Sequence, residues 1–153
     1  VLDLSKIEAG EMKTEKSDFI MSTLLDDVST MFEMRCDQKS LQWSLVNDLD
    51  RNIEVRGDQG KIRQILINLL GNAVKFTEKG MVQLRAFAGK NDQFVFEVKD
   101  TGPGISPLEQ DLVFNMFHQV VGDIHATGTG LGLSISKRQA ELMGGTLELN
   151  SQL

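Results

Sequence analysis

The sequence predicts an α+β fold, an α/β two-layer sandwich in which helices cover one face of a mixed, mostly antiparallel sheet. Three observations predict it. Residues 20–38 and 58–76 carry apolar side chains at helical spacing, and residues 81–88 and 93–99 alternate apolar with polar side chains. The connections between these segments are short, which disfavours a purely parallel sheet because parallel strands need long crossovers.

Length and composition limit the classes of function. A chain of 153 residues is large enough for one domain with a core. Its formal net charge of −6 disfavours nucleic-acid binding. The single cysteine, Cys36, excludes an internal disulfide, and we interpret it as a structural thiol in a reducing compartment. Since there is neither a bilayer-length apolar run nor a signal peptide, we expect a cytoplasmic domain without direct membrane contact, whose parent can carry an anchor elsewhere.

The first half of the chain is predicted to hold two helices and several short strands. Residues 1–13 have the pattern of a helix end that stops at Gly10, and Ser17 and Asp18 can cap the following helix. The lone Trp43 is interpreted as a packing residue. The predicted elements are an edge strand at 14–19, a helix at 20–38, and strands at 42–46 and 53–56.

Residues 58–76 form the central predicted helix, with Asp58 as its N-cap. Asn68 and Asn72 are four residues apart and therefore lie one turn apart on the same side. Asn is a mediocre helix former, so two of them indicate either a site with oxygen ligands for a cation such as Mg²⁺ or a simple solvent-facing side. Lys75 could reach a phosphate. The predicted apolar face consists of Ile62, Ile65, Leu66, Leu69, Ala73 and Phe76.

A predicted hairpin, 81–88 with 93–99, leads into the turn Asp100-Thr101-Gly102-Pro103-Gly104. Asp100 could accept a hydrogen bond from the amino group of a base, or could simply cap its own turn. The remaining predicted elements are short helical turns at 106–117, a mobile loop at 118–128, a helix that ends at Gly144-Gly145 and a strand at 146–150.

A second glycine-rich turn, Gly128–Gly132, leads into the helix that runs to Met143. Glycine turns at a helix N-terminus can bind anions, because backbone N–H groups and the helix dipole both favour negative charge. The turn matches neither a dinucleotide-binding fingerprint nor a Walker loop. Ordinary turn glycines are the alternative interpretation.

Together these stretches resemble the catalytic ATP-binding domain of two-component sensor histidine kinases. Leu4–Gly10 resembles the junction that follows the family's dimerisation helices, particularly in hybrid sensor kinases. Asn68-x-x-x-Asn72-Ala-x-Lys75-Phe76 is similar to the family's N box, and Asp100-x-Gly102-x-Gly104 to its G1 box. Phe114-x-x-Phe117 is similar to the F box, and Gly128-x-Gly130-x-Gly132-Leu133 to the G2 box.

The resemblance implies a Bergerat-type ATP-binding fold and roles for individual residues. Asn72 would coordinate Mg²⁺ between the phosphates, Asn68 would line the same site, and Lys75 would contact phosphate. Asp100 would bind the adenine amino group. Residues 106–127 would form a lid. The implied cofactors are ATP and Mg²⁺, and the other implied ATP-binding residues are Gly102, Gly104, Ile105, Phe117, Gly128, Thr129, Gly130, Leu131, Gly132 and Leu133.

Two features of the sequence bear on the reaction. Related gyrase and MutL ATPases carry Glu where this chain has Asn68, and Asn cannot act as a general base. Asn68 therefore favours transfer to a neutral imidazole over hydrolysis. From Asp100 to Ser136 there is no Lys or Arg, which departs from the usual basic lid and leads us to expect an open lid without nucleotide. His118 and His125 lack the context of a phosphoacceptor.

The resemblance also implies how the chain is divided into segments and which partners it binds. Residues 1–13 would end a dimerisation-helix or linker segment, and 14–153 would be the ATP-binding catalytic domain, with its C-terminal strand cut short. The implied partners are a histidine-bearing dimerisation domain and a downstream response regulator or receiver domain. We expect this chain itself to be a monomer. Two alternatives are a regulatory nucleotide- or partner-binding module without kinase activity and a true ATPase.

Overall fold

The computed structural model describes residues 5–6, 8–10, 12–115 and 130–153. The chain divides into two compact units. The central unit is Lys16–Pro103, and the terminal unit combines Val1–Glu15 with Gly104–Leu153.

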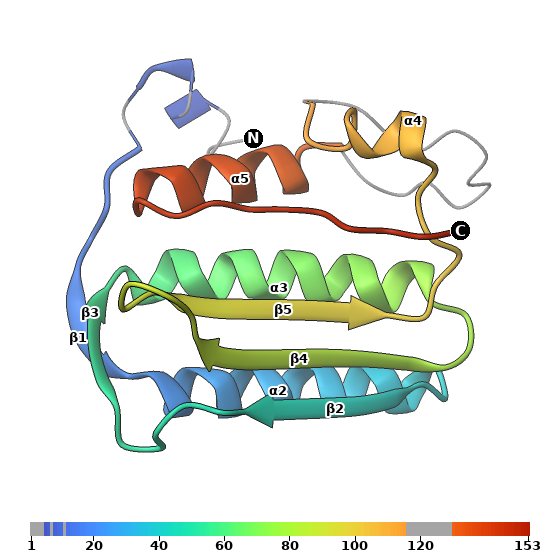
Figure 1. The fold of residues 1–153 in the computed structure, drawn as a ribbon, viewed down its shortest axis with the longest axis horizontal. Helices are drawn as coiled ribbons and strands as arrows, with labels where there is room; N and C mark the ends of the chain where they lie inside the picture. The colour runs from blue at the N-terminus through green and yellow to red at the C-terminus, as the bar shows by residue number, and fades with distance from the viewer. Residues whose placement is uncertain (1–4, 7, 11, 116–129) are drawn as a thin grey trace. The chain divides into compact units, whose positions relative to one another are not determined.

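The central unit is built from two long helices, a three-stranded sheet and a separate strand pair (Figure 1). In the sheet, β4 lies in the middle, parallel to β2 and antiparallel to β5. In the separate pair, β1 is antiparallel to β3. The elements in chain order are β1 (Ser17–Ile20), α2 (Met21–Gln38), β2 (Gln42–Asn47), β3 (Glu54–Gly57), α3 (Gln59–Phe76), β4 (Met81–Ala88) and β5 (Phe94–Asp100).

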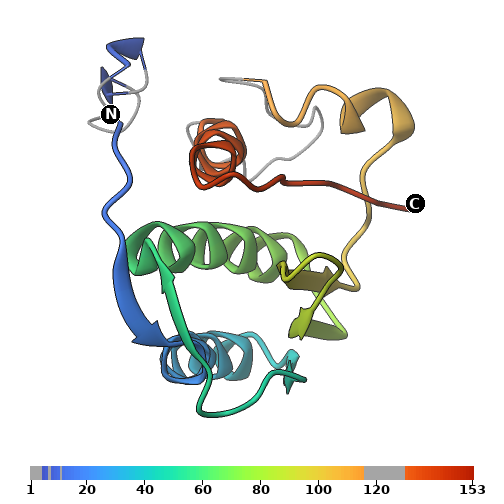
Figure 2. The ribbon, with the colours of Figure 1, turned by 60° about the vertical axis from the view of Figure 1, so that its left-hand side comes forward.

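The two helices cover one face of the sheet, as Figure 2 shows. Each strand of the small pair leads almost directly into a helix, β1 into α2 and β3 into α3. Because the pair is antiparallel, α2 and α3 begin at opposite ends of this short ladder. The predicted α+β class, with a mixed sheet and helices on one face, is confirmed.

The core of the central unit lies between these helices and the sheet. Trp43 packs as predicted, with its ring 6.2 Å from that of Phe32 and its Nε1–H donating to Ser29 Oγ at 2.9 Å. Cys36 is fully buried, and burial raises the pKa of its thiol, with a smaller contribution from the neighbouring Asp37 carboxylate. Other fully buried core residues are Leu24, Leu25, Val28, Phe32, Leu70, Val82, Leu84 and Ala86.

The predicted helix cap at Ser17 and Asp18 is wrong. Both residues belong to strand β1, and Asp18 forms an ion pair with Arg56 across the β1–β3 pair, at 3.1 Å. Helix α2 begins after Ile20, which makes no side-chain cap hydrogen bond. The polar pair therefore serves the strand rather than the helix.

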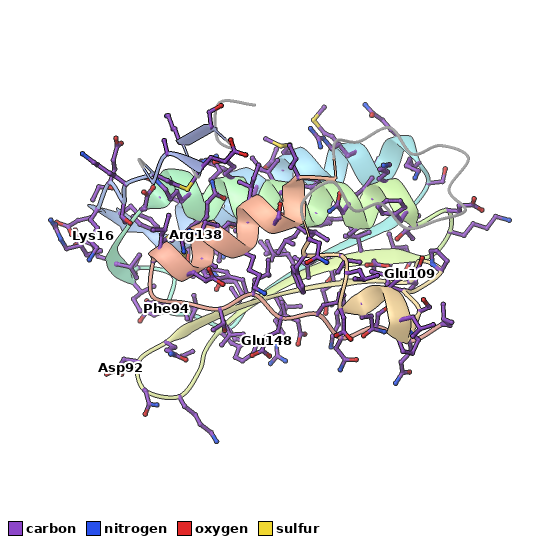
Figure 3. The ribbon with its side chains drawn as sticks, turned by 90° about the horizontal axis from the view of Figure 1, so that it is seen from above. Lys16, Asp92, Phe94, Glu109, Arg138 and Glu148 are labelled. Atoms are coloured by element: carbon purple, nitrogen blue, oxygen red, sulfur yellow. The ribbon has the colours of Figure 1, made fainter. Side chains whose placement is uncertain are left out.

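The hairpin of β4 and β5 is confirmed, and Figure 3 shows Asp92 at its tip with Phe94 at the start of β5. Asn91 and Asp92 have positive φ angles, 56° and 55°, so the tip uses left-handed backbone. The Gly89 N–H donates to the Gln93 carbonyl at 2.8 Å and closes the turn.

In the terminal unit, the structure describes α4 (Pro107–Gln110) and α5 (Gly132–Leu142). Helix α5 ends as predicted. Gly144 has a φ of +77°, its N–H donates to the Glu141 carbonyl, and the Gly145 N–H donates to the Ala140 carbonyl at 2.9 Å. This is a Schellman ending, which needs a residue with positive φ.

The predicted strand at 146–150 is wrong, because these residues form no strand ladder. The described part of the terminal unit contains no β-strand with which they could pair. Near the end of the chain, Ser151 bonds to the loop after Gly104 instead. Its Oγ accepts from the Ile105 N–H at 2.8 Å, and its carbonyl accepts from Gln110 Nε2 at 3.0 Å.

Candidate functional site

Helix α3 carries three of the predicted site residues, and its start is fixed as predicted. The Asp58 side chain accepts a hydrogen bond from the Lys61 N–H at 3.0 Å and forms an ion pair with the Lys61 ammonium at 2.9 Å. Only 4% of Asp58 is exposed, so this cap is a buried and specific one.

The buried side of α3 differs from the predicted apolar face. It consists of Leu66, Leu70, Ala73 and Val74, whereas Phe76 is 40% exposed. Ile65 and Leu69, which were predicted to be part of the face, do not belong to the core cluster of the central unit. The helix is therefore rotated relative to the prediction, because apolar residues cover more than one side of it.

Asn68, Asn72 and Lys75 lie on the side of α3 opposite Leu66 and Leu70, as the helical period requires. All three are half-buried. The Lys75 ammonium also lies 4.7 Å from the centre of the Phe76 ring, within the range of a cation–π contact. The structure therefore places two amides and one cation along one side of the helix, towards its C-terminal end.

The C-terminal end of α3 is held by Lys39, a residue that sequence reasoning missed. The Lys39 ammonium donates to the carbonyls of Val74 at 2.6 Å, Lys75 at 3.2 Å and Thr77 at 3.0 Å. In the sequence, Lys39 is an ordinary lysine at a helix end. Nothing local to it indicates a contact with residues more than 30 positions away.

Asp100 and Gly102 form a tight turn at the end of β5. The Gly102 N–H donates to Asp100 Oδ1 at 2.8 Å. A Cβ on Gly102 would lie 2.8 Å from Asp100 Oδ1 and 3.3 Å from the Phe76 carbonyl, so the position has no room for a side chain. The turn of the predicted G1 stretch therefore packs against the end of α3.

A buried hydroxyl lies beside the same turn. Thr77 is fully buried, and its Oγ1 has no hydrogen-bond partner among the residues that the structure describes. A Cβ on Gly102 would lie 3.4 Å from this oxygen. An unsatisfied buried hydroxyl is costly, which makes it a candidate for contact with a water molecule or a ligand.

Gly104 and Ile105 belong to the terminal unit, where they meet the end of the chain. Gly104 has a φ of +78°, and a Cβ there would clash with the Gln152 carbonyl. The Ile105 carbonyl accepts from Gln110 Nε2 at 2.8 Å. In this unit both residues have a structural role: they hold the loop after β5 against the C-terminal segment.

The described part of the second glycine stretch begins at Gly130, whose φ is +67°. Leu131 is buried and is the N-cap of α5, with no side-chain cap hydrogen bond, and Gly132 and Leu133 begin the helix. The predicted glycine turn at a helix start is therefore present at 130–133. Phe117, His118, His125, Gly128 and Thr129 lie outside the described residues, and so does the part of the predicted lid from 116 to 127.

Lys137, a cation that sequence reasoning missed, follows the predicted lid in the chain. The Lys137 ammonium of α5 is 5.1 Å from the centre of the ring of Phe114, the first aromatic of the predicted F box. The stretch without Lys or Arg ends immediately before this residue. The sequence could have indicated this cation, because Lys137 is the first lysine of the helix that follows the second glycine-rich turn.

No group of three or more His, Cys, Asp or Glu side chains suited to a metal occurs among the described residues. Asn72 offers one neutral oxygen. Mg²⁺ is commonly held by one or two protein ligands together with substrate phosphates. The donor set of α3 therefore fits a cation that is bound jointly with a polyphosphate.

Comparison with known proteins identifies the class. Residues 57–153 match the family model described as histidine kinase-, DNA gyrase B-, and HSP90-like ATPase. The chain therefore belongs to this family of ATP-binding domains, as the sequence motifs predicted.

Similar proteins place it more closely. The chain is 36% identical over 155 residues to the aerobic respiration control sensor protein ArcB of Escherichia coli, covering 99% of this chain and 20% of ArcB. It is 40% identical over 157 residues to the virulence sensor protein BvgS of Bordetella pertussis, covering 99% of this chain and 13% of BvgS. The chain thus spans a fifth or less of the length of these relatives.

Solved structures agree with this placement. Full-length ShkA in complex with AMPPNP is similar with a TM-score of 0.81 and 31% identity, over 98% of this chain and 32% of that one. The catalytic domain of histidine kinase ThkA is similar with a TM-score of 0.69 and 27% identity, over 83% and 82% of the two chains. The chain is thus an ATP-binding catalytic domain of the sensor histidine kinase type.

Within the described parts of the chain, no helix is both long and apolar enough to cross a bilayer.

Proposed function

We propose that this chain binds Mg²⁺–ATP and presents the γ-phosphate to a histidine on a separate dimerisation domain of its parent kinase. The observation that carries the proposal is the packing of the Asp100–Gly102 turn against the end of α3, the helix that bears Asn72 and Lys75. A carboxylate suited to a base and side chains suited to phosphates are thereby held close together. The similar ShkA was solved in complex with AMPPNP, which supports nucleotide binding by this chain.

Asp100 is the residue that would bind adenine. Its Oδ1 is held by the Gly102 N–H, and no described side chain donates to Oδ2. Oδ2 can therefore accept from the exocyclic amino group of adenine. Guanine has a carbonyl at that position, and two acceptors would face each other, so the same carboxylate would discriminate against GTP.

The phosphates would lie along the polar side of α3. Asn72 would supply an oxygen ligand to Mg²⁺, Asn68 would line the same site without adding negative charge, and Lys75 would contact phosphate. When bound, the cation would neutralise charge on the phosphate oxygens. Because Asn68 is an amide, it cannot accept a proton from water, which disfavours hydrolysis.

Further ATP-binding residues are proposed in the terminal unit. In its described part, Gly130 precedes Leu131, the N-cap of α5, which makes no side-chain cap hydrogen bond, and glycine turns at a helix N-terminus can bind anions. The residues proposed to contact the nucleotide are Gly104, Ile105, Phe117, Gly128, Thr129, Gly130, Leu131, Gly132 and Leu133.

In the proposed reaction, an imidazole nitrogen attacks the γ-phosphorus, the bond between this phosphorus and the β–γ bridging oxygen breaks, and ADP leaves. The imidazole is a neutral nucleophile with its own lone pair, so it needs little activation. The part of the protein is to position the two reactants and to stabilise the charge that develops. The phosphohistidine would then serve a response regulator or receiver domain.

Residues 1–13 are proposed to be the end of the dimerisation helices or their linker, with the catalytic domain at 14–153. Residues 5, 6 and 8 are helical, and Gly10 has a φ of +66°, as expected where a helix stops. We also propose that this domain is monomeric and lies in the cytoplasm, whether or not its parent is membrane-anchored.

The test is phosphotransfer from ATP to an added histidine-bearing helical hairpin, measured beside phosphate release. We expect label on the hairpin histidine, its loss in Asn72→Ala, and normal transfer in Arg51→Ala, which removes only an exposed ion pair with Asp26. Nucleotide binding without any transfer would replace the proposal with a regulatory module. Rapid phosphate release that does not need the hairpin would replace it with a true ATPase.

A further inference from the structure

Lys39 makes three long-range hydrogen bonds within the described central unit. It lies 35, 36 and 38 positions from Val74, Lys75 and Thr77, and its ammonium donates to all three carbonyls. A lysine ammonium has three N–H donors. All three donors are therefore used on the last turn of α3 and the residue after it.

The position of Lys39 is set by the way α2 ends. The N–H of Ser40 donates to the Asp37 carbonyl at 3.0 Å, and the N–H of Leu41 donates to the Cys36 carbonyl at 2.9 Å, which is a Schellman ending. Ser40 adopts a φ of 57°, a conformation unfavourable for a residue other than glycine. Leu41 is buried and anchors the chain into β2. This ending holds Lys39 at the C-terminal end of its helix.

The acceptors are the groups that a helix leaves without partners. The last carbonyls of an α-helix have no intrahelical donor, and the dipole makes that end favourable for a cation. The Ala73 carbonyl is already satisfied by the Thr77 N–H at 3.1 Å. The Lys39 ammonium binds the next two carbonyls and that of Thr77. It therefore fixes the backbone from Val74 to Thr77.

That backbone forms part of the candidate nucleotide site. Lys75, whose carbonyl Lys39 binds, is the residue proposed to contact phosphate. The adjacent Phe76 carbonyl limits the space at Gly102, which in turn holds Asp100. A shift of the end of α3 would therefore move Lys75, the proposed phosphate contact, and would also disturb the Asp100–Gly102 turn that is proposed to bind the base.

We propose that Lys39 is a positioning residue of the nucleotide site, which acts on bound ATP through the end of α3 and Lys75. This inference rests on the proposed function, because it needs ATP to bind at α3. Lys39 itself is not proposed to touch the nucleotide. Its action is to keep the phosphate-binding end of the helix in one conformation.

The experiment measures the dissociation constant of Mg²⁺–AMPPNP by calorimetry on the full chain. Lys39→Met keeps the length of the side chain and removes its donors, and Lys39→Arg keeps a cationic donor. Val28→Ala is the control for stability, because it removes buried methyl groups from the core about 16 Å earlier along α2. Each variant is also combined with Lys75→Met, and unfolding curves show that each protein is folded.

We expect Lys39→Met to weaken binding about tenfold, equivalent to about 1.4 kcal/mol. Lys39→Arg should recover most of this loss, and Val28→Ala should bind like the wild type. In the Lys75→Met background, Lys39→Met should have less than about a third of its effect, because residues that act through one another are not additive.

Two results would overturn the inference. One is binding by Lys39→Met and Lys39→Arg that matches Val28→Ala, which would make the contact purely structural. The other is the same fold loss in the wild-type and Lys75→Met backgrounds, which would exclude action through Lys75. Failure of the proposed function would look different, since the wild type would then not bind AMPPNP or Lys75→Met would have no effect.

Discussion

The backbone N–H of Gly102 donates a hydrogen bond to Oδ1 of Asp100 at 2.8 Å, so a glycine and a carboxylate two residues apart close one turn. The turn fixes the direction of the carboxylate before any ligand is bound. A preorganised acceptor of this kind loses little freedom on binding.

The first prediction tests this turn. In Gly102→Ala, the new Cβ would lie 2.8 Å from Asp100 Oδ1 and 3.3 Å from the Phe76 carbonyl, so the carboxylate must turn away. We expect Mg²⁺–AMPPNP to bind about ten- to a hundredfold more weakly, the loss of one charge-assisted hydrogen bond. Calorimetry measures the change, and Gly71→Ala is the control, because a Cβ there meets nothing within 4 Å. Equal affinities in the two variants would show that the turn does not orient the base contact.

A second prediction concerns the end of the chain. Gly104→Ala places a side chain at a φ of +78° and against the Gln152 carbonyl. We expect the contact between Ile105 and Ser151 to open, with a loss of about 1–3 kcal/mol in the local free energy of opening. Hydrogen exchange at the Ile105 amide should become faster, while exchange in β4 stays unchanged. An Ile105 amide as protected as in the wild type would contradict the described packing.

The third prediction is about the role of the amide at position 68. In Asn68→Glu, a carboxylate able to accept a proton from water replaces a group that cannot. We expect ATP hydrolysis without any histidine acceptor to rise, measured as phosphate release. Asn68→Gln, which lengthens the amide without adding a base, is the matched control and should not raise release. Lower or unchanged release in Asn68→Glu would count against this account of the position.

Cys36 provides a prediction about pH. Burial and the Asp37 carboxylate raise the pKa of the thiol in the folded state, so the folded protein keeps its proton at pH values where the unfolded chain has lost it. The stabilising contribution is therefore complete below the pKa of the unfolded thiol and decreases as the pH rises through that of the folded one. As the pH is raised from about 8 to 10, the free energy of unfolding should therefore decrease less in Cys36→Ala than in the wild type. Identical slopes for the two proteins would exclude the effect.

Much of the fold could be predicted because its signals are local. The Asp58 cap, the helical spacing of α3, the alternation of β4 and β5 and the glycine ending of α5 each depend on neighbours along the chain. The candidate site residues on α3 and in the Asp100–Gly102 turn could be predicted for the same reason. Spacing alone puts Asn68 and Asn72 one turn apart.

Other features depend on contacts between distant segments. The parallel pairing of β2 with β4 joins strands that the whole of α3 separates, and no local pattern indicates it. The rotation of α3 was mispredicted because Ile65, Leu69 and Phe76 make a second apolar side as plausible as the first. The 146–150 stretch alternates like a strand, but a strand needs a partner to form a ladder.

The most direct test of the central claim is calorimetry of Mg²⁺–AMPPNP binding to the wild type and to Asp100→Asn. The account predicts binding that requires Mg²⁺ and that weakens about ten- to a hundredfold in the variant, because the amide can present an N–H where a carboxylate oxygen stood. No binding to a folded wild-type protein would contradict the account. Equal binding by the two proteins would also contradict it.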